Sequence, residues 1–281
     1  VLMVRDAMKG DPHTEPEPWT WVRTQGNGRI FYTASGHDQR VWNNAGFHQL
    51  LKSGILWAVG GKARKRYDNF LASRAPLKYE KRGNIPNYER RPKPLEYQLP
   101  LPPAESMKYT QVPVGFRMEL FASEPNVINP IYMTWDERGR LWVVESVDYP
   151  NEFKAGRKGN DRIKVCEDTN GDGRADTAKT FYQGNDVNAA LGIAVLGTKV
   201  IVSCSPNILL FTDENGDDLA DGPPTVLFSG IGGVDHDHGA HAFVFGPDGK
   251  LYFNVGNSGG QLKTADGKKF IVDKAGNEVN G

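Results

Sequence analysis

A nine-residue acidic unit occurs twice in the second half of the chain. Its copies span residues 168–176 and 213–221, so their first residues lie 45 positions apart. Each copy has oxygen-bearing side chains at positions 1, 3, 5 and 9, and a main-chain carbonyl at position 7. These donors are Asp168, Asn170, Asp172, Arg174 and Asp176 in the first copy, and Asp213, Asn215, Asp217, Leu219 and Asp221 in the second. Hard oxygens in a tight curl are typical ligands of calcium, so we expect calcium in at least one copy.

Position 6 distinguishes the two copies. It is Gly173 in the first copy and Asp218 in the second, and glycine tolerates the positive φ of a tight curl. The first copy is therefore the better predicted site. Neither copy is an EF-hand, because Lys179 and Pro224 stand at position 12, where a bidentate glutamate belongs. The alternative is that both copies are solvated polar hairpin turns.

A cluster of histidines gives the second candidate site. Residues 235–241 hold three of the six histidines of the chain, together with two aspartates. Imidazole titrates near neutrality and binds metals, so Asp235, His238 and His241 are candidate catalytic residues. The alternative is that these imidazoles hold neighbouring strands through backbone hydrogen bonds.

Short apolar runs surround both candidate sites and predict the elements that position them. The alternation of apolar and polar residues, interrupted by turn residues, is typical of short β-strands. We expect strands at 116–121, 131–135, 141–145, 163–166, 178–181, 191–195, 200–204, 208–211, 225–228, 242–245 and 251–255. Four strands per repeat indicate propeller blades. Two blades and most of a third are visible, which is fewer than a closed ring needs, so we expect a partial β-propeller over 109–281.

The first 61 residues have a different pattern. Two strand-like runs flank the turn 25–28, and apolar residues then follow at helical spacing from Asn44, a good N-cap residue, to Gly60. This order predicts a hairpin, a loop and an amphipathic helix, as at the end of an α/β domain. Residues 62–108 are basic and contain prolines, which favours an extended linker.

Composition limits the possible classes of protein. The net charge is zero, 38% of residues are hydrophobic, and the 32 glycines agree with many turns. No apolar run approaches the ~20 residues of a membrane span, and no signal peptide is visible. Cys166 and Cys204 are too few for a disulfide framework. Because the chain begins at Val1 and its last residues form no closing element, we expect a piece of a longer protein.

Residues 26–38 and 54–58 resemble the C-terminal end of trehalose-utilisation (ThuA-like) domains. The matching sequence is Gly-Asn-Gly-Arg-Ile-Phe-Tyr-Thr-Ala-Ser-Gly-His-Asp, followed by Gly-Ile-Leu-Trp-Ala. The resemblance implies a flavodoxin-like α/β fold and a link with carbohydrate metabolism. No active site can be assembled from the part of the domain that is covered. His37 follows a strand, and we expect it to fix the loop between strand and helix.

Residues 238–257 resemble the soluble aldose dehydrogenases. The resemblance implies a six-bladed propeller that uses pyrroloquinoline quinone and calcium. In that family a histidine eight residues before a Gly-Pro-Asp turn is the general base, and His238 stands eight residues before Gly246. The family has Asp after the next strand, where this chain has Asn257. Asn cannot supply the negative charge that assists a histidine base.

The whole of 109–281 is similar to large secreted planctomycete-type proteins named membrane-bound dehydrogenases. The similarity rests on residues 121–125, 135–142, 148–150 and 238–249 and on both acidic units. That group often carries a haem-binding Cys-x-x-Cys-His domain, and sometimes a ThuA-like domain. This chain has no Cys-x-x-Cys-His motif, so we expect no haem in it.

The expectations combine as follows. Residues 1–61 end a ThuA-like domain, 62–108 form a linker, and 109–281 begin a sugar-dehydrogenase-like propeller. The expected function is quinone-dependent oxidation of a carbohydrate or polyol, in the periplasm or outside the cell. The expected partners are the substrate and an electron acceptor. We expect no nucleic acid partner and no membrane span. The alternative is a non-catalytic, calcium-stabilised propeller that binds glycans or proteins.

Overall fold

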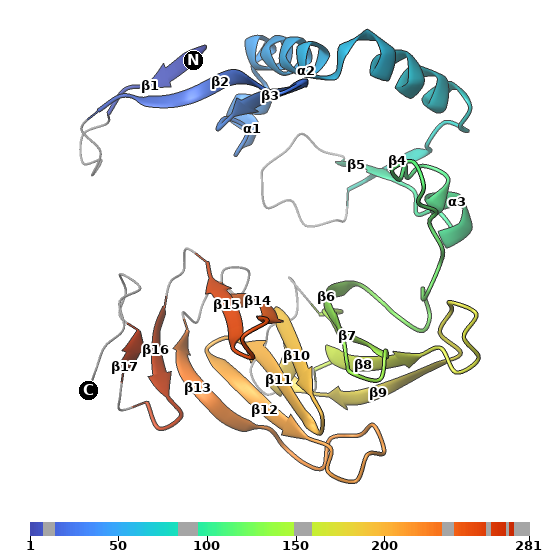
Figure 1. Cartoon of the computed structure of the whole chain (residues 1–281), viewed down its shortest axis with the longest axis vertical. Helices are drawn as coiled ribbons and strands as arrows, with labels where there is room; N and C mark the ends of the chain where they lie inside the picture. The colour runs from blue at the N-terminus through green and yellow to red at the C-terminus, as the bar shows by residue number, and fades with distance from the viewer. Residues whose placement is uncertain are drawn as a thin grey trace. The chain divides into compact units, whose positions relative to one another are not determined.

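The computed structural model describes residues 1–7, 15–83, 95–148, 159–231, 239–256, 260–267 and 270–272. These residues form two compact units, 1–111 and 112–281 (Figure 1).

The first unit begins with a three-stranded antiparallel sheet in the order β1-β2-β3. Its elements are β1 (Met3–Arg5), β2 (Glu17–Gln25), β3 (Gly28–Thr33), α1 (Gln39–Trp42) and α2 (Ala45–Ala72). The predicted N-cap is confirmed, because the side chain of Asn44 accepts hydrogen bonds from the amides of Gly46 and Phe47. Gly54 lets α2 lie against β3, since a Cβ on this residue would stand 2.5 Å from the ring of Phe31.

The helix α2 does not end where the sequence predicts. Gly60 has a φ of 73°, and the helix kinks there and continues to Ala72. The rest of the predicted linker also contains regular structure. The strands β4 (Tyr79–Arg82) and β5 (Leu95–Gln98) pair antiparallel, and α3 (Pro103–Met107) begins with a proline in its first turn. The described part of the predicted linker is therefore not simply extended chain.

The second unit is mainly β, as expected. Its first sheet is a meander of β6 (Pro130–Trp135), β7 (Leu141–Glu145), β8 (Arg162–Glu167) and β9 (Thr177–Gln183). After the 3₁₀ turn η1 (Asn185–Val187), a second meander follows with β10 (Gly192–Leu196), β11 (Lys199–Cys204), β12 (Asn207–Thr212) and β13 (Thr225–Ile231). A third, two-stranded sheet holds β14 (Ala240–Phe245) and β15 (Leu251–Val255).

Two features differ from the predicted strand pattern. Residues 116–121 form no strand, although residues 121–122 pack against the first sheet. The strands β16 (Gly260–Thr264) and β17 (Phe270–Val272) join the second sheet through β13 and not the third (Figure 1). The second sheet therefore has six strands, so the third sheet has two strands among the described residues where a blade would have four.

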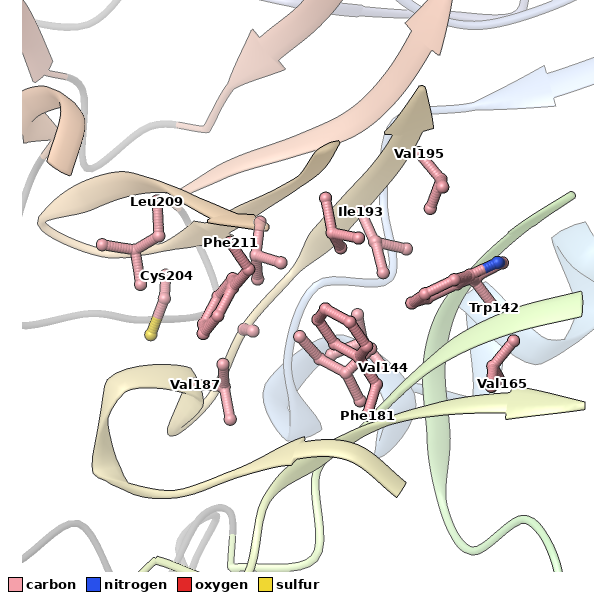
Figure 2. Close-up of a cluster of buried hydrophobic side chains, with 14 residues drawn as sticks. Trp142, Val144, Val165, Phe181, Val187, Ile193, Val195, Cys204, Leu209 and Phe211 are labelled. Atoms are coloured by element: carbon pink, nitrogen blue, oxygen red, sulfur yellow. The ribbon is translucent and has the colours of Figure 1, made fainter. Parts of the chain in front are cut away.

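The main core lies between the first and second sheets. Side chains of β7, β8 and β9 face those of β10, β11 and β12 (Figure 2). Trp142 and Phe181 contact edge to face with ring centroids 5.0 Å apart, and Phe181 reaches Phe211 of the second sheet at 6.2 Å. Burying such aromatic side chains is the main source of stability in a core of this type.

A smaller core joins the second sheet to the third. Phe243 is buried and stacks on Phe253, with ring centroids 5.1 Å apart. A Cβ on Gly192 would stand only 2.4 Å from the ring of Phe243, so glycine is needed for this close approach. The first strand of the second sheet, β10, lies beside both β6 and β14. The three sheets thus follow one another face to face, in chain order.

Candidate functional site

The sheets have two ends, which we name from the residues they carry. The histidine end holds the starts of β6, β10 and β14 and the last residues of β7, β11 and β15. The loop end holds the turns between the first two strands of each sheet and both acidic units. Contacts between sheets confirm that like ends meet. Asp161 at the start of β8 accepts from the amide of Ala189, which precedes β10, and Arg140 in the turn before β7 contacts Asp218 of the second acidic unit.

The two acidic units fold in the same way. The carboxylate at position 1 accepts hydrogen bonds from the amides at positions 4, 5 and 6 in both copies. In the first copy, Asp168 Oδ1 and Asn170 Oδ1 both accept from the amide of Asp172, at 3.2 and 2.9 Å, so these two oxygens lie side by side. Hydrogen bonds from backbone amides hold the pKa of Asp168 below its ordinary value, the one from Gly173 having the largest effect.

Each acidic unit also docks on the chain that precedes its sheet. The amide of Ala175 donates to Phe121 at 2.9 Å, and the amide of Ala220, at the same position of the second copy, donates to Phe181 at 3.1 Å. The second unit is therefore part of the packing between two sheets, whereas the first holds the segment that precedes β6. This role was missed by sequence reasoning, because the partners are far apart in the chain.

The charges of the second acidic unit are balanced by side chains of the first sheet. Arg140 is buried and contacts both Asp136, at 2.8 Å, and Asp218, while Lys179 lies 2.8 Å from Asp218. Asp218 has a φ of 65°, so it adopts the left-handed conformation expected for a glycine at this position. Burial alone would raise the pKa of Asp218, but hydrogen bonds from Lys179 and Arg140 outweigh it and lower the pKa.

The donors of these loops give a partial fit to a metal ion. Within the described residues, no group of three or more His, Cys, Asp and Glu is arranged to hold a metal. The donors predicted for the first copy also include Asn170 and the carbonyl oxygen of Arg174, which are not among these four residue types. Calcium in the first copy stays a prediction. In the second copy Arg140 and Lys179 already supply positive charge.

The predicted catalytic residues are only partly described. Asp235 and His238 lie outside the described residues, as does Asn257. His241 is the second residue of β14 and pairs with Asn254 of β15. Its Nε2 atom is buried and has no hydrogen-bond partner within the described part of the chain. The pairing shifts register just after His241, where Ala242 has a φ of 59°. Such bulges redirect side chains and are frequent beside functional sites.

Buried carboxylates stand at the histidine end of the first sheet. Asp161 is fully buried and accepts from the amides of Val147, Asp148 and Ala189 at 2.6–2.8 Å. Glu145, also fully buried, accepts from Ile128 at 2.7 Å and from Arg162. Three of these four carboxylate oxygens accept from amides in loops, and the fourth, on Glu145, accepts from Arg162 of β8. No motif in the sequence marked these residues.

This geometry separates the two predicted sites. The acidic units lie at the loop end and His241 lies at the histidine end, so a calcium ion held by either unit would not touch a ligand at His241. Among the described residues, the histidine end offers few cations for the carboxylates of pyrroloquinoline quinone. Arg162 lies there, but its Nε donates to Glu145. The described residues thus do not fit that cofactor by themselves.

No helix in the described residues combines the length and apolarity that crossing a membrane requires.

Residues 1–58 match the family of trehalose utilisation (ThuA) domains, in agreement with the resemblance seen in the sequence. Searches of curated proteins and of solved structures return no match. Residues 102–278 match a family described as a domain of unknown function. Since this match covers more than half of the chain, the chain belongs to the DUF7133 family.

Proposed function

We propose that residues 109–281 form blades of a β-propeller that oxidises a carbohydrate or polyol, as part of a periplasmic or extracellular protein. The observation that carries this proposal is the buried Nε2 atom of His241 near the start of β14, which has no hydrogen-bond partner among the described residues. The face-to-face order of three antiparallel sheets supports the propeller arrangement. The ThuA match supports a link with carbohydrates.

The role of this chain in such a reaction is to bind and orient a hydroxyl and to accept its proton. A histidine is suited to this role because its neutral ring accepts a proton near pH 7. His238 and Asp235 complete the proposed set from the segment before β14. A bound pyrroloquinoline quinone supplies a two-electron acceptor in proteins that carry it. The described cations of this chain do not fit that group.

The experiment follows dye reduction by the protein, supplied with quinone and calcium, on a panel of sugars and polyols. We expect His241→Ala and His238→Ala to lower the turnover number about 10²- to 10⁴-fold, the usual effect of removing a general acid or base. His48→Ala, which changes an exposed histidine of α2, is the matched control. Full activity in both His241→Ala and His238→Ala would refute the proposed base.

The second candidate is a non-catalytic, calcium-stabilised propeller that binds glycans or proteins. The shared hydrogen-bond pattern of the two acidic units favours it, because those units serve packing at the end away from His241. Asn257, which stands where the dehydrogenases have Asp, also favours it. Glycan binding without dye reduction on any sugar would select this candidate.

A further inference from the structure

We propose that Ser146, Ser205 and His241 form a hydroxyl-binding site at the histidine end, which takes a neutral polyhydroxy ligand. The inference depends on the proposed function for the class of ligand. It adds two serines, which no sequence motif marks, to the residues that recognise it.

Three buried polar side-chain atoms of the described second unit lack a hydrogen-bond partner. In the described part of the second unit, the buried side-chain atoms without a hydrogen-bond partner are Ser146 Oγ, Ser205 Oγ and His241 Nε2. Native proteins leave few buried polar groups unpaired, and each one that is found requires an explanation. Ser146 is only 3% exposed, so bulk water does not satisfy its hydroxyl group.

The three residues that carry these atoms lie at the same end of their sheets. Ser146 directly follows β7, Ser205 directly follows β11, and His241 stands at the start of β14, so all three lie at the histidine end. Ser205 and the segment before His241 are in close contact. A Cβ on Gly239 would stand only 2.2 Å from Ser205 Oγ, so glycine leaves the space that this hydroxyl occupies. The three unpaired atoms named above therefore all belong to residues at the same end of the described second unit.

The side chains of these three residues can both donate and accept hydrogen bonds. A serine hydroxyl donates one hydrogen bond and accepts others, and an imidazole ring nitrogen donates or accepts according to its protonation. A ligand with several hydroxyl groups matches this set, because each of its hydroxyls also donates and accepts. The buried carboxylates of Glu145 and Asp161 lie at the same end and disfavour an anionic ligand.

A neighbouring serine supplies the control. Ser203 is two residues before Ser205 and is buried, but its hydroxyl donates to the carbonyl of Ala240 and is therefore already satisfied. Removing Ser203 Oγ breaks a buried hydrogen bond, whereas removing Ser205 Oγ deletes an unpaired polar atom. The first change should destabilise the protein and the second should not.

The experiment measures binding of sorbitol, D-glucose and trehalose by calorimetry, and the melting temperature, for Ser205→Ala, Ser146→Ala and Ser203→Ala. We expect the first two variants to bind at least one of these probes about tenfold or more weakly with an unchanged melting temperature. We expect Ser203→Ala to melt at a lower temperature and to bind as the parent does.

The possible failures are distinguishable. If Ser205→Ala and Ser146→Ala bind the probes like the parent but melt lower, their hydroxyls hold structural water and the inference is overturned, while oxidation by the histidines stands. If the parent binds none of the probes, the inference is also overturned. If binding depends on these serines but no dye is reduced, the site is confirmed and the oxidation is refuted.

Discussion

Arg140 and Asp218 are 78 residues apart in the chain and form a buried ion pair that joins the first sheet to the second acidic unit. The guanidinium also contacts Asp136, whose other hydrogen bonds include one of 2.9 Å from the indole of Trp142. Lys179 completes the network from the half-exposed side. A metal ion in the second unit would compete with these two cations.

Removing Arg140 tests the value of this network. Arg140→Ala leaves Asp136 and Asp218 buried without their main partner, and breaking a buried pair in this way typically costs about 3–5 kcal/mol. We expect the free energy of unfolding, measured with urea, to fall by about that amount. Lys179→Ala, which removes a half-exposed partner, is the control and should lower the free energy of unfolding much less, because solvent screens exposed pairs. Equal losses in the two variants would show that burial does not set the strength of the network.

Acid should weaken the same network. The pKa values of Asp136 and Asp218 are both lowered in the folded protein, since hydrogen bonds and charges outweigh burial. A lowered folded pKa gives stability that is present above the unfolded value of about 4 and is lost as the pH falls through the folded value. We expect the free energy of unfolding to decrease with falling pH below about 4, and to decrease less steeply in Asp218→Asn.

Asn suits the position of Asp218, because it tolerates the left-handed conformation. Glu137→Gln, an exposed change in the turn 136–140, is the control and should keep the slope of the parent. If the free energy of unfolding of Asp218→Asn falls with pH as steeply as that of the parent, Asp218 does not contribute to the acid dependence.

Calcium is expected in the first acidic unit and not in the second. Calorimetric titration should give a dissociation constant of about 10⁻⁵–10⁻³ M, the range of weaker loop sites. Asp172→Asn should abolish the heat, while Asp217→Asn, at the same position of the second unit, should not change it. Heat no greater than that of a chelator blank in the parent protein would reject the site.

Gly192 tests the packing of the second sheet on the third. Gly192→Ala places a methyl group 2.4 Å from the ring of Phe243, so the ring or the strand must move. Overpacking of this kind typically costs about 1–3 kcal/mol. Gly222→Ala, where a Cβ meets nothing within 4 Å, is the matched control. Urea unfolding that is the same for both variants would show that the two sheets do not pack as described.

The two thiols should be unreactive in the folded protein. Burial raises the pKa of Cys204 to about 12 and also raises the pKa of Cys166, and both thiols are free. Because the thiolate is the reactive form, we expect neither to react with a disulfide reagent at pH 8 until the protein unfolds. Titration with the reagent before and after adding guanidinium checks this. Fast reaction of one thiol in the native protein would contradict the burial of that residue.

Local patterns predicted most of the strands. From 131 to 255 each expected strand lies within a few residues of an observed one, because alternation and turn residues act over short distances. The run 116–121 alternates as well as the others but forms no strand, since alternation does not supply a partner. The pairing of β13 with β16 is a long-range choice that no local pattern encodes.

The candidate site was less predictable. The acidic spacing predicted two similar curls, and both were found, but it did not predict that Asp218 would be paired with Arg140. No sequence motif marks Ser205. It becomes a candidate only through its close contact with Gly239, which the structure shows. Contacts between residues that are distant in the chain are set by packing, and local sequence patterns do not predict them.

The face-to-face stacking of the sheets has a consequence for how such a protein can diversify. The first two sheets are anchored at the loop end through Arg140 and Asp218, and at the histidine end through Asp161 and the amide of Ala189. Because both ends carry such anchors, substitutions that spare these residues should leave the stacking intact. The scaffold can therefore diverge in sequence around a small set of fixed contacts.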